Sequence, residues 1–502
     1  MESLFKRILT SSVYEAALET PLDKAELLSE RLKNTVLLKR EDQQPVFSFK
    51  LRGAYNKIAN LSDAEKKMGV IAASAGNHAQ GVVYSAARLG ISALIVMPTT
   101  TPEIKIEAVK KMGGEVELFG ESYSEAAERA IILQKESGRI FIHPFDDELV
   151  IAGQGTVADE LLRQNPGRLD AVFIPVGGGG LAAGMAVYIK TLRPEIKVFG
   201  VEPTDSDAMY QSLEKGERVM LDSVGIFADG VAVRQVGVLT FAMCQKYLDG
   251  VIRVSTDAIC GGIKAVYQAT RSVVEPAGGL AVAGLLHYIR STGCKGETLV
   301  AINTGANMNF ERLRYVAERT LVGEQQEALF AVTIPEKPGA LKKFCVEMVG
   351  QRNITEFNYR FRTQEKAHIF VGISITQVEE RVSFSQQLTA AGYENIDLTD
   401  NGLAKTHVRY MVGGHSDAVH NERIFRFWFP ERPGALARFL DATRGRRNIS
   451  LFHYRAQGGD FGRVLIGLQI PDDDDEALYE RLNNLGYRYV EETENPAYAL
   501  FL

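Results

Sequence analysis

Short apolar runs alternate with longer segments of helical spacing from about residue 35 to residue 320. Most runs are apolar throughout, which is typical of parallel strands covered on both faces. The segments between them, such as 76–90 and 103–112, have the spacing of amphipathic helices. This alternation predicts an α/β doubly wound architecture with parallel sheets. The predicted strands are VLLKR (36–40), GVIAAS (69–74), ALIVMP (93–98), EVELFG (115–120), IFIHPF (140–145), AVFIPV (171–176), KVFGVE (197–202) and TLVAIN (298–303).

The pattern changes after LVGEQQEALF (321–330), where the chain begins to repeat itself. When residues 329–375 are laid over residues 424–470 without a gap, 17 of the 47 positions are identical. For example, IPEKPGALKKF falls on FPERPGALARF. Agreement of this extent indicates an internal duplication. Each copy has the order strand, helix, strand, strand, helix, strand, and so predicts a small α+β module of the split βαβ type.

Composition and charge exclude several classes of protein. A net charge of -6 and a pI near 5.9 argue against a general nucleic-acid binder. No run approaches 18 apolar residues, and the first residues lack the apolar region of a signal peptide, so we expect a soluble cytoplasmic protein with no membrane partner. The four cysteines, Cys244, Cys260, Cys294 and Cys345, lack CxxC spacing. We interpret them as small buried apolar residues and expect no metal site.

Lys50 stands between Phe49 and Leu51, in a stretch otherwise suited to burial. A lysine in such a place can lay its stem along apolar surface while its ammonium reaches water. Alternatively, it can be kept from water so that its amine loses its proton and acts as a nucleophile. The local sequence alone favours the first interpretation, so the rest of the chain must decide.

Two strand-to-helix turns carry candidate binding residues. SAGNHAQG (74–81) places Asn77, whose side chain offers both a donor and an acceptor, at such a turn. A turn in which Asn and Gly serve only the backbone shape explains this motif equally well. We interpret His78 as structural. VGGGGLAAG (176–184) is a stronger signal. Backbone N–H groups converge at the N-terminus of a helix there, which is a typical phosphate site. Because four glycines cost conformational entropy without contributing packing, a purely structural interpretation is weak.

A dinucleotide site is the main alternative. Gly177, Gly179 and Ala182 satisfy G-x-G-x-x-A, and Glu202 ends the next predicted strand. However, these glycines lie in the middle of the α/β half, and the alternative leaves Lys50 unexplained. A P-loop is excluded because no Lys-Ser/Thr pair follows the glycines.

A third strand end, in TLVAINTGAN (298–307), places the hydroxyl of Thr304 at the carboxyl edge of the sheet, where such folds bind ligands. A lysine, a phosphate cradle, an amide and a hydroxyl together form a suitable set for pyridoxal phosphate. The lysine would react with the aldehyde, the backbone amides would bind the phosphate, and the polar groups would contact the ring.

Five motifs carry a resemblance to a known family: SFKLRGAY (48–55), SAGNHAQG (74–81), GGGGL (177–181), EPAGGL (275–280) and NTGAN (303–307). They resemble fold-type II, tryptophan-synthase-β-like pyridoxal-phosphate enzymes, and more narrowly the biosynthetic threonine dehydratases. The duplicated half resembles the tandem ACT-like regulatory domains of that family. The resemblance implies a catalytic domain over 1–322, a linker over 323–328, a first regulatory domain over 329–401, a connector over 402–423 and a second regulatory domain over 424–502.

The resemblance also implies a role for each site residue. Lys50 bonds covalently to pyridoxal 5'-phosphate and later removes the α-proton of the substrate, and burial lowers its pKa so that it can act as a base. Asn77 contacts the ring oxygen, and Thr304 faces the ring nitrogen at a position where the family usually has serine. The phosphate is bound by backbone amides of Gly177, Gly178, Gly179, Gly180 and Leu181. From the residues themselves, we expect that Glu275 either helps to hold a ligand or simply starts a helix, and that Arg52 pairs with a nearby acid rather than touching a ligand.

The implied activity is deamination of L-threonine to 2-oxobutanoate and ammonia, the first step of isoleucine biosynthesis, by a homotetramer. Isoleucine as inhibitor and valine as activator are implied to bind the C-terminal domains. The candidate effector contacts are Gly339, Ala340, Leu341, Asn353, Gly434, Ala435, Leu436 and Asn448. Alternatives with the same fold are an L-serine dehydratase, a serine racemase or another lyase. In other classes, the alternatives are a non-catalytic amino-acid sensor and an NAD(P)-binding oxidoreductase.

Overall fold

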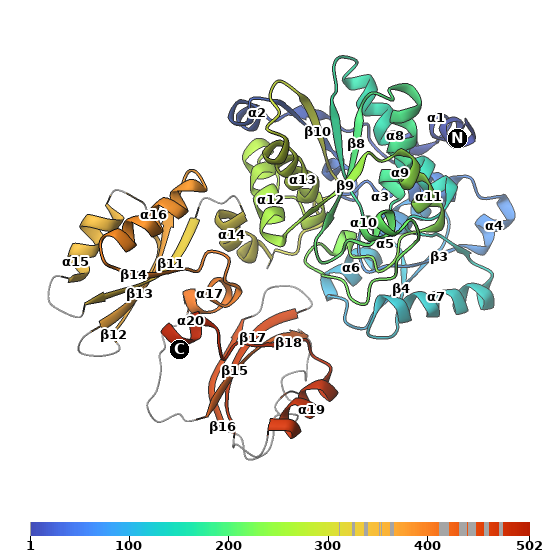
Figure 1. The fold of residues 1–502 in the computed structure, drawn as a ribbon. Helices are drawn as coiled ribbons and strands as arrows, with labels where there is room; N and C mark the ends of the chain where they lie inside the picture. The colour runs from blue at the N-terminus through green and yellow to red at the C-terminus, as the bar shows by residue number, and fades with distance from the viewer. Residues whose placement is uncertain are drawn as a thin grey trace. The chain divides into compact units, whose positions relative to one another are not determined.

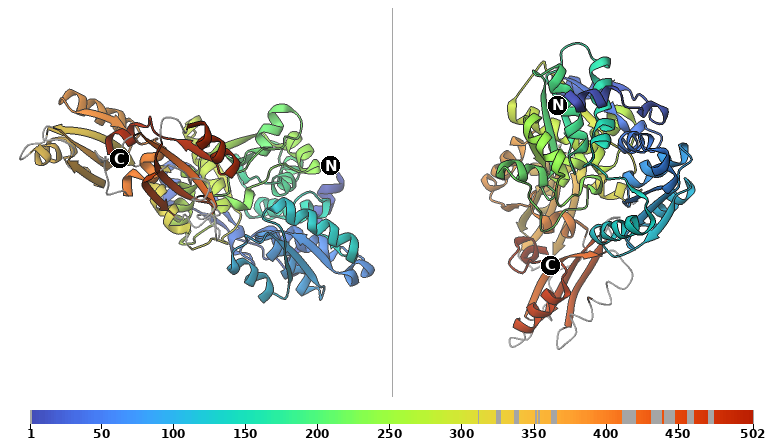
Figure 2. Two further views of the ribbon diagram at one scale, coloured as in Figure 1. Left: turned by 90° about the horizontal axis from the view of Figure 1, so that it is seen from below. Right: turned by 90° about the vertical axis from the view of Figure 1, so that its right-hand side faces the viewer.

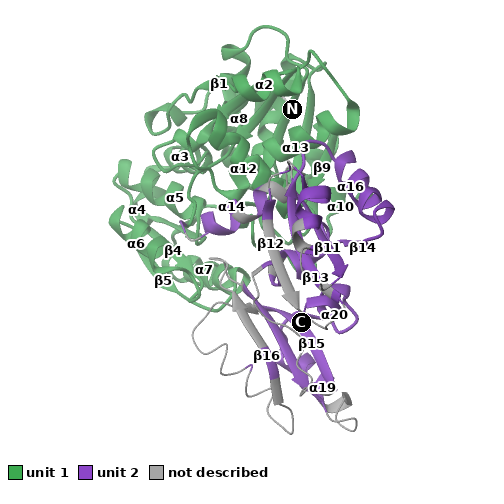
Figure 3. Cartoon of the chain, turned by 90° about the vertical axis from the view of Figure 1, so that its left-hand side faces the viewer, with its two compact units in different colours: residues 1–309 green, residues 310–502 purple. Residues whose placement is uncertain are grey.

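The fold is described from a computed structural model of the chain (Figure 1). The chain forms two compact units, residues 1–309 and 310–502, which are coloured separately in Figure 3. The division falls before residue 322, where the sequence predicts the end of the catalytic domain. The structure describes residues 2–310, 312–323, 327–335, 340–350, 352, 354–361, 366–410, 421–430, 439, 448–455, 461–470 and 475–501.

Unit 1 contains two mainly parallel sheets. The larger has the strand order β1-β2-β10-β7-β8-β9, in which only the edge pair β1–β2 is antiparallel. The smaller has the order β5-β4-β3-β6 and is parallel throughout. The strands are β1 (Leu22–Lys24), β2 (Thr35–Arg40), β3 (Val70–Ala73), β4 (Ala93–Met97), β5 (Glu115–Leu118), β6 (Ile140–Phe141), β7 (Ala171–Pro175), β8 (Lys197–Pro203), β9 (Gly250–Val254) and β10 (Thr298–Asn303).

The predicted α/β architecture is confirmed, with differences at the edges of the sheets. Every predicted strand is present within two residues at each end, except that the run 140–145 forms only the short strand β6. The strands β1 and β9 were not predicted, because their short segments mix charged and apolar residues. Every residue of β3 and β7 is buried, which explains their continuously apolar sequences.

Helices cover both sheets of unit 1, and local sequence signals fix their ends. Ser62 and Ser122 each form a capping box with the glutamate three residues later, and Asp147 accepts hydrogen bonds from the first-turn amides of α8. In all views, the segment from α4 to α7 forms a lobe of its own with β3, β4 and β5 (Figure 2). The helices are α1 (Glu2–Leu9), α2 (Glu26–Leu32), α3 (Lys50–Ala59), α4 (Asp63–Met68), α5 (Asn77–Arg88), α6 (Glu103–Lys111), α7 (Tyr123–Ser137), α8 (Glu148–Gln164), α9 (Gly180–Leu192), α10 (Ala208–Lys215), α11 (Val238–Tyr247), α12 (Thr256–Thr270) and α13 (Pro276–Thr292).

Unit 2 contains two four-stranded antiparallel sheets that repeat one topology. Their orders are β12-β13-β11-β14 and β16-β17-β15-β18, so equivalent strands of the two copies occupy equivalent positions. Both sheets also carry a register irregularity at the same point, between Ile354 and Glu356 in one and between Ile449 and Leu451 in the other. A shared irregularity of this kind supports the duplication. The strands are β11 (Glu327–Pro335), β12 (Ile354–Phe361), β13 (Lys366–Ser374), β14 (Glu394–Asp397), β15 (Glu422–Pro430), β16 (Asn448–Arg455), β17 (Phe461–Gln469) and β18 (Tyr489–Glu491).

The two modules of unit 2 share part of their core. Leu329 and Phe370 of the first module belong to one buried apolar cluster with Ile424 and Leu465 of the second. Each module also has a separate core on the opposite face of its sheet. The described helices are α14 (Arg312–Gly323), α15 (Ala340–Phe344), α16 (Glu379–Ala390), α17 (Gly402–Thr406), α19 (Asp475–Leu485) and α20 (Pro496–Phe501).

A buried network of charges holds the start of α3 in unit 1. The fully buried guanidinium of Arg52 donates to both carboxylate oxygens of Glu41, each at 2.8 Å, and to Glu160 at 2.6 and 3.0 Å. Lys39 Nζ donates to the same Glu160 carboxylate at 2.6 Å. Two cations thus balance two anions, as a buried ion cluster requires. The expectation that Arg52 pairs with an acid is confirmed.

Replacing Glu160 with Gln should destabilise unit 1 strongly. The substitution leaves the charges of Arg52 and Lys39 in a buried site with only Glu41 to balance them, and we expect a loss of about 3–5 kcal/mol in the free energy of unfolding. Urea denaturation followed by circular dichroism measures this loss. Glu148→Gln is a matched control on the same helix, because Glu148 is exposed and should change stability by less than about 1 kcal/mol. Equal denaturation midpoints for the two variants would contradict the prediction.

Candidate active site

Lys50 is the first residue of α3, and its amine lies close to a backbone carbonyl and to an aromatic ring. Nζ donates a hydrogen bond to the carbonyl oxygen of Pro144 at 3.1 Å and lies 5.4 Å from the centre of the Phe49 ring. Burial lowers the pKa of Lys50 to about 8, and the nearby carboxylate of Glu275 opposes this shift. The direction of the shift is the one expected from the sequence. The neutral fraction of the amine near physiological pH is therefore far larger than in an ordinary lysine, which favours a role as nucleophile or base.

Asn77 is the first residue of α5, and its amide is held in one orientation from two sides. Its Nδ2 donates to Glu275 Oε1 at 2.6 Å, and its Oδ1 accepts from Asn307 Nδ2 at 2.7 Å. Asn307 also donates to the carbonyl oxygen of Val46 at 2.9 Å. Because an amide nitrogen carries two hydrogens, one hydrogen of Asn77 is left for a ligand after the bond to Glu275.

The glycine-rich loop connects β7 to α9. Helix α9 begins at Gly180, and the preceding Gly179 has φ of +95° and, as a glycine, has no side chain that could cap the first amides of the helix. The first amides of a helix have no partner within it, so here they are free to bind an anion. This arrangement agrees with the predicted phosphate cradle formed by Gly177 to Leu181.

The glycines also have a packing role, contrary to the expectation from the sequence. A Cβ on Gly178 would overlap the ring of Phe145, and a Cβ on Gly180 would lie 3.1 Å from the carbonyl oxygen of the same residue. A Cβ on Gly177 would lie 3.0 Å from the Cα of Val231. The statement that four glycines pack against nothing was therefore wrong, because they admit neighbouring chain segments at close range.

Thr304 follows β10 and presents a polar atom without a partner. Its carbonyl oxygen accepts a hydrogen bond from the backbone N–H of Phe49 at 3.2 Å, which places it beside the lysine. Its Oγ1 is buried and has no hydrogen-bond partner among the described residues. A buried hydroxyl without a partner is unfavourable unless a ligand supplies one. This hydroxyl therefore fits a ligand with a polar ring atom.

The four elements meet in one neighbourhood. Phe145, which packs against the glycine loop, follows directly after Pro144, whose carbonyl holds the lysine amine. The Glu275 carboxylate, which accepts from Asn77, lies close to Gly305, the residue after Thr304: a Cβ on Gly305 would lie 2.5 Å from Glu275 Oε1. The predicted lysine, amide, glycine loop and hydroxyl are thus brought together.

Two neighbouring residues have roles that the sequence left open or missed. Glu275 is the residue before Pro276 at the start of α13, and its carboxylate also binds the Asn77 amide. The helix-start interpretation of Glu275 is thus confirmed, whereas a direct contact with a ligand stays a prediction. The role of Asn307 could not be predicted from the sequence, although this residue lies within the motif NTGAN. His78 is structural, as predicted: its Nε2 lies 2.8 Å from the carbonyl oxygen of Ile142, and burial lowers its pKa to about 3.

The competing sites are not supported by the part of the chain that the structure describes. The buried carboxylate of Glu202 accepts hydrogen bonds from the backbone amides of Met209 and Tyr210 at the start of α10, so both of its oxygens already have a partner within the protein. No group of three or more His, Cys, Asp or Glu residues able to hold a metal ion is found in the described part. Among the described residues, no helix is long and apolar enough to cross a membrane.

The four cysteines are free thiols. Cys244 and Cys260 are buried, whereas Cys294 and Cys345 are only half-buried. The expectation of burial is therefore correct for two of the four.

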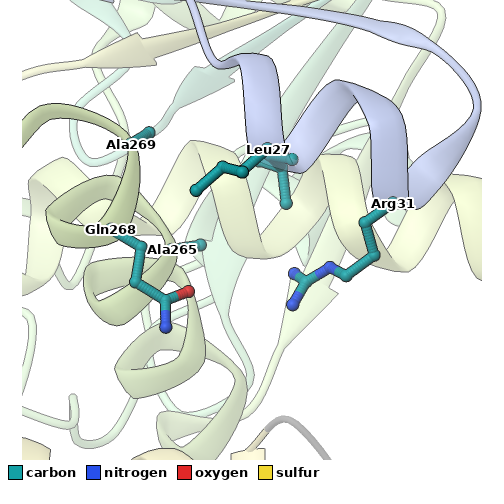
Figure 4. Close-up of a pocket in the computed structure, with 6 residues that line it drawn as sticks. Leu27, Arg31, Ala265, Gln268 and Ala269 are labelled. Atoms are coloured by element: carbon teal, nitrogen blue, oxygen red, sulfur yellow. The ribbon is translucent and has the colours of Figure 1, made fainter.

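A pocket between α2 and α12 is separate from the site of Lys50 (Figure 4). Among the described residues that line it, Arg31 is the only charged one, and none is a predicted site residue.

Most of the predicted effector contacts cannot be compared with the structure. Ala340 is buried at the start of α15, Leu341 follows it in that helix, and Asn448 begins β16. These positions stay predictions. The other predicted contacts, which lie outside the described residues, are Gly339, Asn353, Gly434, Ala435 and Leu436.

Comparison with known proteins agrees with this site. Residues 13–305 match the family described as pyridoxal-phosphate dependent enzyme. Residues 318–408 and 414–502 both match the C-terminal regulatory domain of threonine dehydratase, in agreement with the duplication. Among solved structures, the processed form of threonine deaminase isoform 2 from Solanum lycopersicum is 50% identical, with a TM-score of 0.62 over 63% of this chain and 87% of that chain. Maize serine racemase is 31% identical, with a TM-score of 0.59 over 64% of this chain and 97% of that chain.

Curated relatives match along the whole chain. The L-threonine dehydratase biosynthetic IlvA of Burkholderia multivorans is 57% identical over 500 residues, which cover 99% of this chain and 98% of that protein. The protein of the same name from Escherichia coli is 53% identical over 498 residues, which cover 99% of this chain and 96% of that protein. The chain therefore belongs to the pyridoxal-phosphate-dependent enzymes, in the threonine dehydratase family that carries a C-terminal regulatory domain.

Proposed function

We propose that the chain catalyses the deamination of L-threonine to 2-oxobutanoate and ammonia, with pyridoxal phosphate as its cofactor. The observation that carries this proposal is the position of a lysine of lowered pKa beside a glycine loop and a buried hydroxyl without a partner. The identity to biosynthetic threonine dehydratases supports the choice of substrate and the place of the reaction in isoleucine biosynthesis.

The residues present fit the cofactor group by group. Lys50 Nζ is the amine that would condense with its aldehyde, with loss of one water. The free amides at the start of α9 would bind its phosphate. The second hydrogen of the Asn77 amide would bind its ring oxygen, and Thr304 Oγ1 would face its ring nitrogen. When bound, the cofactor supplies an electron sink that stabilises negative charge at Cα of the substrate.

Within this site, the chain's own residues accept the proton that leaves Cα of the substrate. Lys50 Nζ in its neutral form removes the proton from Cα of threonine, and its position at the start of a buried helix keeps the amine from full hydration. Elimination releases the β-hydroxyl as water, and a later water releases the nitrogen as ammonia. The net change is therefore L-threonine to 2-oxobutanoate plus ammonia, with atoms in balance.

A serine-specific lyase or racemase is the second candidate, because maize serine racemase shares the fold at 31% identity. The two candidates differ in the methyl group on Cβ of the substrate. The ratio of kcat/KM for L-threonine to that for L-serine distinguishes them, and formation of D-serine from L-serine would identify a racemase. A catalytically inactive sensor would turn over neither substrate.

We propose that unit 2 regulates this activity. The sequence boundaries given above, with the catalytic domain ending at 322 and regulatory domains over 329–401 and 424–502, remain part of the proposal, as do isoleucine as inhibitor and valine as activator. The match of both copies to a regulatory domain supports it. Regulation requires that each effector binds two states of the enzyme with unequal affinity. A homotetramer and a cytoplasmic location are further predictions that rest on the resemblance.

Lys50→Ala should lower kcat for threonine by at least about a thousandfold, because it removes both the covalent anchor and the base. A keto-acid assay measures the loss, and the visible absorption of the bound cofactor should change with it. Lys57→Ala is the matched control, because Lys57 lies on the same helix but pairs with Asp147 at 2.7 Å. Substantial activity in Lys50→Ala would contradict the proposed role.

The rate at which the apoprotein takes up pyridoxal phosphate should depend on pH through Lys50. Only the neutral amine reacts, so the rate should rise about tenfold per pH unit below the pKa and level off above about pH 8. Stopped-flow absorbance measures this rate. Because the Glu275 carboxylate raises the pKa of Lys50, Glu275→Gln should move the midpoint to lower pH. A rate that is independent of pH would disprove the assignment.

Removing residues 323–502 should leave threonine deamination but abolish inhibition by isoleucine. Unit 1 has its own apolar cores, which supports its ability to keep its fold after the deletion. Activity at increasing isoleucine concentration, for the full and shortened chains, measures the effect. Inhibition that persists in the shortened chain would refute regulation by unit 2.

A further inference from the structure

The second module contains the single tryptophan of the chain, and three arginines surround it. Trp428 lies on β15, and the guanidinium carbons of Arg426, Arg463 and Arg488 lie 5.1, 4.6 and 4.5 Å from the centre of its ring. Arg463 is the cross-strand partner of Trp428 on β17, and the backbone N–H of Trp428 donates to the carbonyl oxygen of Arg488 at 2.9 Å. Figure 1 shows these strands side by side in the C-terminal module.

Positive charge is in excess in this cluster. Arg426 is balanced, because it donates to Glu492 at 2.7 Å. Arg463 Nη1, in contrast, is buried and makes no hydrogen bond to any residue that the structure describes. Burial lowers the pKa of Arg463 to about 10; Tyr315 opposes this shift, whereas the nearby charges of Arg426, Arg319 and Arg488 act in the same direction as burial. A buried guanidinium N–H without an acceptor is costly, and an anion would relieve both the missing bond and the repulsion.

The first module shows that the fold does not require this cluster. At the equivalent positions, 95 residues earlier, Trp428 and Arg463 are replaced by Thr333 and His368, which also face each other across two strands. The hydroxyl of Thr333 lies 3.1 Å from Nδ1 of His368, so the polar groups of that pair satisfy each other. Ala331 takes the place of Arg426. The arginines are thus specific to the second module and are not a structural feature of the repeat.

We propose that Arg463, Arg488 and Trp428 form a binding site for a small molecule with an oxyanion group and net negative charge. Guanidinium groups recognise carboxylate and phosphate through paired N–H donors. An amino acid fits this site poorly, because its ammonium group would enter a region of excess positive charge. The ligand is therefore a phosphorylated compound or a carboxylic acid without an amine, which is a class distinct from the amino-acid effectors proposed above.

Trp428 makes the proposal directly testable, because tryptophan fluorescence of the full holoenzyme comes from this position alone. The enzyme is titrated with pyrophosphate and, separately, with 2-oxobutanoate, at an ionic strength held constant with chloride. A saturable change with pyrophosphate assigns a phosphate ligand, and one with 2-oxobutanoate assigns a carboxylate. Absence of a saturable change with both probes would overturn the proposal.

Two substitutions test whether the arginines act directly. Arg488→Met should weaken binding about tenfold by removing an exposed guanidinium, and Arg463→Met should weaken it at least as much. Arg423→Met is the matched control: it removes the same charge from β15, but this arginine donates to Tyr479 at 3.0 Å on the other face of the sheet. Equal weakening by Arg423→Met and Arg488→Met would show general charge attraction and would disprove a built site.

Discussion

The buried charge network of Arg52 is the constraint on which the catalytic half depends. It joins β2 through Lys39, the turn after β2 through Glu41 and helix α8 through Glu160. Arg52 lies two residues after Lys50 on α3, so the network fixes the first turn of the helix that carries the reactive amine. An arginine suits this position because its planar guanidinium can bind two carboxylates at once.

The site also shows how a mainly parallel sheet concentrates chemistry. Asn77, the glycine loop and Thr304 all follow the carboxyl ends of strands, from β3, β7 and β10, where α/β folds bind ligands. Lys50 enters from a different direction, at the start of a helix, and its amine rests on the carbonyl of Pro144. The glycines after β7 have two functions, since they expose helix amides and also allow Phe145 to pack closely.

Sequence patterns predicted those parts of the structure that depend on local order. Continuously apolar strands and the strand-end positions of Asn77 and Thr304 are local features, and the repeat can be found by comparing the chain with itself at an offset of 95 residues. The bonds that orient Asn77 could not be predicted in this way, because they come from Glu275 and Asn307, 198 and 230 residues away along the chain. The contact of Gly178 with Phe145 and the gathering of arginines around Trp428 likewise depend on tertiary packing.

The common apolar cluster between the two modules of unit 2 has an evolutionary consequence. Leu329, Phe370, Ile424 and Leu465 cover one another, so either module alone would present an apolar sheet face to water. Exposed faces of this kind promote aggregation. If one copy were lost, polar substitutions would be needed on the exposed sheet face of the other. Loss of both copies together removes both apolar faces at once. Gain or loss of unit 2 is thus expected to involve both modules together. Substitutions at the shared apolar faces of the two modules are expected to be coupled, even where their outer surfaces diverge.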